Sequence, residues 1–391
     1  MFRNLYILGL VAAALHRRLW LPILSPDKGE KYEGELLPHD LLLEIFSYLP
    51  AKKILQLQLL SKSFRRLAAD PRFRLLQSQR NLAASGVFIY DPFDGRLDLF
   101  LLNHAAGFPL PQFLVRFLQV VFNDALLIVS SRGLLFYRHR GGDNFLVVNP
   151  ACNDVRMIPA PPEGCSDMPY KGLAVKFLDD DDHLKCKYQL VYLRTTNAWS
   201  SLYQLCLYDS AVGEWIVDDW QVDLGSPFLN LRNLVVFKGS VFVASNLSSR
   251  VAAIDTSTKL VDFLQVPDSV SQGDGLINMA VCDEASGERS WLCLVYYNNL
   301  SGKFTLWRWL KGSIWVKFSE VVVDGLRCGN EEDDFTLCDG GTMNGLLLFL
   351  NTNGNQAYRY SFNLQQFIKL ETKTGIFCRR FLAYSNSLRP C

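Results

Sequence analysis

The stretch LVVNPACNDVRMI, residues 146–158, contains the unit that decides the fold. It reads as an apolar strand that ends at a polar residue, a turn of three to five residues and a second strand. Five further copies are IYDPFDGRLDLF (89–100), LYDSAVGEWIV (207–217), AIDTSTKLVDFL (253–264), WRWLKGSIWVKF (307–318) and RYSFNLQQFIKL (359–370). They begin roughly 46 to 61 residues apart, which is typical of the blades of a β-propeller.

Two more strand-like runs precede most copies, so the chain divides into quartets of strands. These quartets cover residues 126–158, 171–222, 232–266, 276–322 and 335–370. The copy at 87–102 lacks its first strands, and the tail at 375–388 lacks partners, so pairing the two would complete a sixth blade without exposed sheet edges. The pattern predicts a mainly β fold with a propeller of about six blades. A β-sandwich followed by loosely related sheets is the alternative, because turn-punctuated strands are common to all β folds.

A helical segment, LLPHDLLLEIFSYLPAKKILQLQLLSKSFRRLAADPRF, precedes the strands at residues 36–73. Pro50 separates a first helix from a second over residues 51–60, and Ser61 offers a hydroxyl cap for a third. Asp70-Pro71 is expected to end that helix. Three short helices cannot hide this many leucines in their own core, so part of their surface is expected to meet another protein.

Composition and charge narrow the class of partner. The 391 residues include 40 basic and 39 acidic side chains, and the net charge of +1 provides no basic field for nucleic acid or an anionic membrane. The ten cysteines form no C-x-x-C pair and have no histidines at zinc-finger spacing. We therefore expect reduced thiols and a cytoplasmic or nuclear protein.

The first 35 residues are expected to be a disordered leader and linker. The apolar run Leu5–Leu15 is too short to span a bilayer. It resembles part of a signal or transit peptide, but the unpatterned cysteines argue against export, so organelle targeting by residues 1–26 is the less favoured alternative.

The helical segment resembles the F-box, the module that binds the Skp adaptor of cullin ubiquitin ligases. The resemblance rests on the opening Leu37-Pro38, on DLLLEIF, on Leu49-Pro50 and on LSKSFRRL. It implies a three-helix F-box at residues 36–80 that binds a Skp adaptor and, through it, a cullin. The adaptor-binding residues that it implies are Leu37, Pro38, Leu41, Ile45, Leu49, Pro50 and Leu55.

The strand region is similar to the kelch-like F-box-associated domain of plant F-box proteins. This similarity rests on SSRGLLFYRHRGGDNFLVVNPACNDVRMIPAPP (130–162) and on the tail FLAYSNSLRP (381–390). It implies a kelch-like propeller over residues 86–391.

Together the two resemblances imply the substrate-recognition subunit of a Skp–cullin–F-box ubiquitin ligase, with no catalysis, cofactor or metal of its own. None of the five histidines lies in a catalytic or metal-ligand motif, which leaves little support for a copper oxidase, a class that also uses kelch-like propellers. The acidic run at 179–182 lacks the glycine turn and distal Glu of an EF-hand loop. The alternative function is a propeller scaffold that acts outside any ligase.

An unknown target protein is expected on the propeller face that carries the loops between second and third strands. Propellers commonly use such loops for binding. The expected contact residues are Arg138, Arg140, Trp199, Asn246, Arg250, Asn298 and Asn351. For the Asn residues in this set, a simple turn role is the alternative.

Overall fold

The computed structural model describes part of the chain. The described residues are 39–391 except 81–85, 91–96, 102–124, 140–143, 153, 162–170, 179–186, 196, 198, 217–219, 232, 246–248, 274, 284–289, 299–300, 311–313, 323–334, 338–345, 352–355, 362–365, 371–379, 385–387 and 389–390. The expected leader, Leu37 and Pro38 lie outside them.

Four helices form the N-terminal module of the described chain. They are α2 (His39–Ser47), α3 (Ala51–Leu57), α4 (Lys62–Ala69) and α5 (Pro71–Arg80). The Oγ of Ser61 accepts a hydrogen bond from the backbone N–H of Phe64 at 3.2 Å, so the predicted cap of α4 is confirmed. The predicted second helix is too long, because α3 ends at Leu57 and residues 58–60 form a turn.

The helix α5 was missing from the sequence prediction, which described three helices and ended the third at Asp70-Pro71. Proline is well accommodated at the first position of a helix, where its missing N–H costs no hydrogen bond. The Oδ1 of Asp70 accepts from the N–H of Arg72 at 2.8 Å, as a helix cap does. The same two residues therefore end α4 and begin α5.

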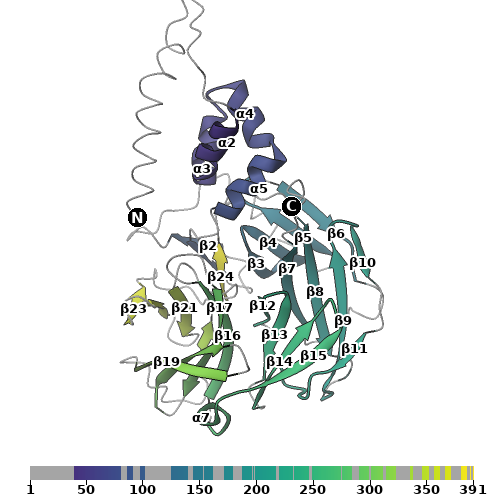
Figure 1. The fold of residues 1–391 in the computed structure, drawn as a ribbon, viewed down its shortest axis with the longest axis vertical. Coiled ribbons are helices and arrows are strands. Elements are labelled where there is room, and N and C mark those ends of the chain that lie inside the picture. The colour runs from purple at the N-terminus through teal and green to yellow at the C-terminus, as the bar shows by residue number, and fades with distance from the viewer. Residues whose placement is uncertain are drawn as a thin grey trace, which may run out of the picture.

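The described strands form six antiparallel sheets (Figure 1). The first contains β2 (Leu97–Leu101), β1 (Gly86–Tyr90) and β24 (Arg380–Tyr384); the second β3 (Ala125–Ser131), β4 (Leu134–His139), β5 (Phe145–Asn149) and β6 (Asp154–Ile158); the third β7 (Lys171–Leu178), β8 (Lys187–Thr195), β9 (Leu202–Asp209), β10 (Glu214–Ile216) and β11 (Gln221–Asp223). The fourth contains β12 (Val235–Phe237), β13 (Ser240–Ala244), β14 (Arg250–Asp255) and β15 (Leu260–Gln265); the fifth β16 (Gly275–Asp283), β17 (Ser290–Asn298), β18 (Lys303–Leu310) and β19 (Ile314–Val322); the sixth β20 (Phe335–Leu337), β21 (Leu346–Asn351), β22 (Gln356–Ser361) and β23 (Gln366–Leu370).

The two ends of the strand region pair with each other and close the ring of sheets. In β1, Gly86 lies opposite Tyr384 of β24, and Tyr90 lies opposite Arg380. The strand β24 contacts β3 of the second sheet as well as β20 and β21 of the sixth. The predicted β-propeller and its closing sixth blade are confirmed, and the sandwich alternative is wrong.

The blades pack against one another through both faces of their sheets. In β8, Tyr188, Leu190 and Tyr192 pack toward the second sheet, whereas Val191 and Leu193 pack toward the fourth. Alternate residues of one strand thus enter two different cores. This explains why inner strands such as β8 and β17 carry consecutive buried residues, whereas outer strands such as β15 and β19 keep exposed positions.

The antiparallel order of the strands gives the propeller two distinct faces. We call the face with the β8–β9 loop (196–201), the link 224–234 and the link 266–274 the loop face. The link 266–274 contains the short helix α7 (Asp268–Ser271). The helical module packs on the other face, against Ala151 and Cys152 in the turn between β5 and β6. Figure 1 shows α7 and the helical module at opposite ends of the molecule.

Candidate functional site

The helical module buries a small core of its own. Phe46 and Phe73 are almost completely buried, and the ring of Phe46 meets that of Phe64 edge-on at 5.2 Å. Five leucines are partly buried against this core: Leu42, Leu43, Leu49, Leu55 and Leu57. These side chains are enough to hold the four helices together.

Other apolar residues of the module remain on its surface. Leu59 is 81% exposed, Leu41 is 48% exposed and Leu60 is 47% exposed. Pro50 is exposed as well, and Ile45 is half-buried but is not among the residues that pack on the module core. Leu41 and Ile45 are four residues apart in α2 and share one helix face. An exposed apolar surface on so small a module is typical of a protein interface.

The structure thus divides the residues expected to bind the adaptor. Leu41, Ile45 and Pro50 keep exposed surface, whereas Leu49 and Leu55 pack partly on the module core. The sequence prediction did not include Leu59 and Leu60 among the adaptor-binding residues. It assigned both to the second helix. The available signal was LQLQLL, which carries more leucines than one helix face can hold.

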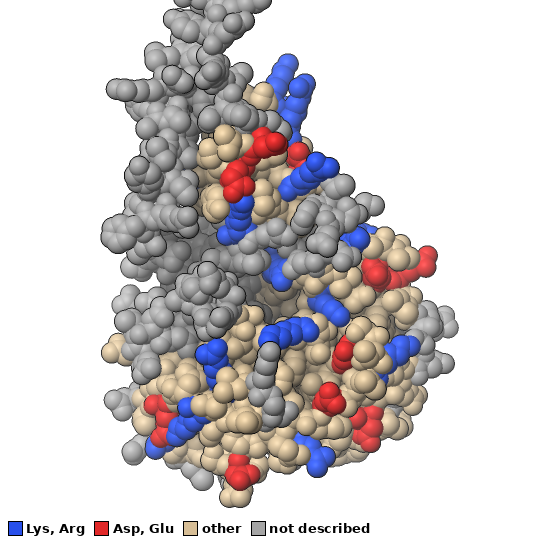
Figure 2. All heavy atoms as spheres, viewed as in Figure 1, with Lys and Arg blue, Asp and Glu red and all other residues tan. Residues whose placement is uncertain are grey.

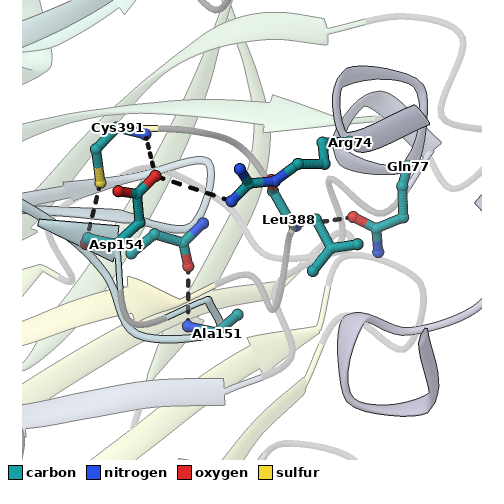
Figure 3. A network of polar contacts seen from close by, with 7 residues as sticks. Arg74, Gln77, Ala151, Asp154, Leu388 and Cys391 are labelled. Carbon is teal, nitrogen blue, oxygen red and sulfur yellow. Dashed lines mark hydrogen bonds and ion pairs between the residues drawn. The ribbon is translucent and has the colours of Figure 1, made fainter. Parts of the chain in front are cut away.

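A polar network connects the module to the propeller and the C-terminus (Figure 3). The side-chain Oε1 of Gln77 accepts from the N–H of Leu388 at 2.9 Å, and Nε of Arg74 donates to the Leu388 carbonyl at 2.9 Å. Nη2 of Arg74 lies 3.8 Å from Oδ2 of Asp154, which also accepts from the N–H of Cys391 at 3.2 Å. We call Arg74, Gln77, Asp154, Leu388 and Cys391 the tail clasp.

The tail clasp is supported by packing. Leu388 is 1% exposed and belongs to the core of the helical module. Burial raises the pKa of the nearby Cys152 thiol, although Arg74 acts in the opposite direction. Because α5, the start of β6 and the chain end are held at one point, the module has a defined orientation on the propeller.

On the loop face, an aromatic pair projects from the junction of the third and fourth blades. Trp199 is 77% exposed, and its ring lies edge-on to that of Phe228 at 5.2 Å. Its backbone has φ 72°, a conformation that is strained for a residue other than glycine. Such strain persists only where the surrounding structure holds it in place.

Buried hydroxyl groups hold the link under Phe228. The Tyr203 hydroxyl donates to the Ser226 carbonyl at 2.9 Å, and Oγ of Ser245 donates to the Phe228 carbonyl at 3.0 Å. The Oγ atoms of Ser226 and Ser245 are 2.9 Å apart. Burial raises the pKa of Tyr203 to about 12, so its hydroxyl stays protonated and can donate. These hydrogen bonds therefore hold the backbone that carries Phe228.

The other residues expected to contact a target are less informative. Arg138 is half-buried in β4, and Arg250 is exposed with its guanidinium 6.0 Å from the centre of the Phe263 ring. The Oδ1 of Asn298 accepts from the N–H of Ser301 at 2.9 Å, which is a turn role. Arg140, Asn246 and the side chain of Asn351 lie outside the described residues. Phe228 was not predicted, and no local pattern in its link indicates exposure.

The described residues show neither a metal-binding cluster nor a membrane-spanning helix. They contain no group of three or more His, Cys, Asp or Glu side chains that could hold a metal ion, and the acidic run at 179–182 lies outside them. No described helix is long and apolar enough to cross a membrane. Figure 2 shows acidic and basic side chains interspersed over the visible face of the propeller.

Comparison with known proteins identifies the helical module. Residues 35–75 match the F-box-like family model. A curated F-box protein of Arabidopsis thaliana is 24% identical over 284 residues, which cover 67% of this chain and 64% of that protein. The chain therefore carries an F-box-like module and is similar to a plant F-box protein. It spans just under two thirds of the length of this relative.

Two solved structures share a weak likeness with this chain. A Lactobacillus plantarum protein is 15% identical, with a TM-score of 0.38, over 66% of this chain and 74% of that chain. Kluyveromyces lactis Hsv2 is 12% identical, with a TM-score of 0.36, over 62% of this chain and 63% of that chain. Scores this low do not establish a common fold.

Proposed function

We propose that this chain is the substrate-recognition subunit of a Skp–cullin–F-box ubiquitin ligase. Its F-box binds a Skp adaptor, and its loop face binds a target protein. The observation that carries the proposal is the placement of two exposed surfaces, one on the F-box and one on the opposite face of the propeller. F-box proteins are generally adaptors, so the chain would act by proximity, raising the effective concentration of a target near the transferring enzyme.

The adaptor interface is proposed on the exposed apolar surface of the F-box. Its described members are Leu41, Ile45, Pro50, Leu59 and Leu60. Leu37, Pro38, Leu49 and Leu55 are retained from the family resemblance, although Leu37 and Pro38 lie outside the described residues and Leu49 and Leu55 pack partly on the module core. Short amphipathic helices of this kind bind by laying an apolar face into a groove of the partner. Full burial of one leucine side chain contributes roughly 1.5–3 kcal/mol, so a few of these residues can supply stable binding.

The test is co-purification with a Skp adaptor after Leu41→Asp together with Ile45→Asp. Two carboxylates on the proposed interface should abolish the complex, because neither can be buried against an apolar groove. Leu260→Asp is a matched control, since Leu260 is 64% exposed on β15 of the propeller. Retained binding by the double variant would refute the proposed interface.

The presence of a cullin separates the ligase subunit from a scaffold that acts outside any ligase. A reconstituted complex should contain the F-box protein, the adaptor and the cullin in one species. Ubiquitin transfer to a bound protein should then depend on the F-box. A complex that excludes cullin would favour the scaffold. The proposed location is the cytoplasm or nucleus, because the cysteines of the sequence form no pattern typical of a disulfide framework.

A further inference from the structure

A buried arginine lies at the loop-face end of the third blade. Arg194 is the penultimate residue of β8, and only 8% of its surface is exposed. Its Nη2 donates to Oε1 of Gln204 on β9. Its Nε is fully buried and has no hydrogen-bond partner, and no carboxylate pairs with the guanidinium among the residues that the structure describes.

A cation in this position needs a counter-charge. An arginine cannot lose its charge at any ordinary pH, and burying an unpaired charge is unfavourable. The one visible partner, Gln204, is a neutral amide. The environment of Arg194 is therefore complementary to an anion that the described chain does not supply.

Of the aromatic pair, Trp199 lies in the loop of the same hairpin, and Phe228 lies in the link to the fourth blade. Arg194 lies directly opposite Gln204 in the register of β8 and β9, at the base of the loop that presents Trp199. Trp199 is the fifth residue after Arg194, so their backbones are no more than about 17 Å apart. By the alternation of β8, Arg194 lies on the side of the second sheet and the aromatic pair on the side of the fourth, so a peptide segment that contacts both has to cross the loop-face end of the third blade.

Two hydrogen bonds support the described part of the loop. The N–H of Ser200 donates to the Asn197 carbonyl at 3.3 Å, and the N–H of Leu202 donates to Oγ of Ser200 at 3.0 Å. Together with the link under Phe228, these bonds fix the Trp199 ring. Such preorganisation lowers the entropy lost on binding.

We propose that this hairpin recognises an acidic-apolar segment of the target protein, in which an Asp or Glu lies close to a large apolar side chain. The carboxylate would meet the terminal guanidinium nitrogens of Arg194, and the apolar side chain would pack on Trp199 and Phe228. The inference rests on the proposed function and names the class of target segment. A nucleic acid fits poorly, because the net charge of +1 provides no extended basic surface.

The experiment selects binders from a displayed library of random peptides on the full chain in complex with its Skp adaptor. Selected peptides should be enriched in Asp or Glu beside Trp, Phe or Leu. The dissociation constant of the strongest peptide should rise about tenfold or more in Trp199→Ser, because aromatic anchors dominate such contacts. It should rise about tenfold in Arg194→Met, which keeps the apolar stem but removes the charge.

A double-mutant cycle tests the charge pair itself. Replacing the acidic residue of the peptide by its amide should weaken binding to the wild-type chain but not to Arg194→Met. Leu260→Ser, at the start of the outer strand β15 and away from the loop face, should leave the peptide affinity unchanged. Selection of no peptide, peptides without acidic enrichment, or additive effects in the cycle would each overturn the proposal.

Two further measurements keep the outcomes distinct. Thermal unfolding of each variant separates loss of peptide binding from loss of the fold. If Arg194→Met is unstable, Trp199→Ser still tests whether the hairpin binds the peptide. Adaptor binding is measured on the same samples. If the adaptor fails to bind, the proposed function fails, and the peptide selection is then repeated on the full chain alone, where the same outcomes decide the inference.

Discussion

The two ends of the molecule expose apolar surface in different ways. The F-box exposes aliphatic leucines on short helices that have already buried a core of their own. The loop face exposes an aromatic pair on a strained loop whose base is tied by buried hydroxyl groups. The difference indicates two kinds of recognition, namely groove filling by several leucines at one end and a single rigid anchor at the other.

The largest expected effect comes from the leucines that lie beyond α3. Leu59→Asp together with Leu60→Asp should lower adaptor affinity by about 100-fold or more, because two leucines would each forfeit roughly 1.5–3 kcal/mol of burial. Isothermal titration with a Skp adaptor measures this. The melting temperature should stay close to that of the wild type, since both side chains are exposed in the free chain. Trp199→Ser is the matched control and should bind the adaptor normally.

The second-largest effect is expected at the tail clasp, which connects the helical module to the propeller. Arg74→Ala together with Gln77→Ala removes both side-chain partners of the Leu388 backbone, whose N–H is buried. The free energy of unfolding of the module should fall by about 2–4 kcal/mol, because unsatisfied buried polar groups are costly. Hydrogen exchange of residues 39–80 reports it. Arg72→Ala on the same helix is the control, and equal exchange in both variants would contradict a structural role for the tail clasp.

A smaller effect is expected beneath the aromatic pair. Tyr203→Phe removes the hydroxyl that donates to the Ser226 carbonyl and leaves that carbonyl without this donor. The free energy of unfolding should fall by about 1–2 kcal/mol. Adaptor affinity should not change. An unaltered denaturant midpoint would show that the base of the loop face is not held as described.

The smallest effect is at the cap of α4. Ser61→Ala removes the acceptor of the Phe64 N–H and should cost about 1 kcal/mol. Chemical denaturation followed by the helical circular-dichroism signal detects it. Ser61→Asp should restore most of the loss, because a carboxylate is an equally good cap, and failure of that rescue would show that the hydrogen bond is not the cause.

Much of the fold could be predicted because its main signals are local. The repeated strand-turn-strand unit is read from a dozen consecutive residues, and the spare strands at the two ends identify each other by elimination. The helix α5 could not be predicted with the same rules, because the pair Asp70-Pro71 is equally typical of the end of one helix and of the start of the next. The predicted final strand of the third blade is in fact two short strands, β10 and β11, which both pair with β9.

The candidate sites were less predictable, because exposure depends on tertiary packing. Trp199 was singled out from its loop, but its partner Phe228 comes from a link 29 residues later along the chain. Arg194 lies near the end of β8, and nothing in that strand predicts that its guanidinium lacks a carboxylate. Leu49 and Leu55 resemble the exposed leucines in the sequence pattern, and only the fold shows that they pack inward.

Hydrogen exchange of the full chain with and without a Skp adaptor tests most directly whether the two ends serve different partners. We expect the adaptor to protect α2 and residues 58–60 from exchange and to leave exchange in residues 197–230 of the loop face unchanged. Protection of the loop face by the adaptor, or none in the F-box, would contradict it.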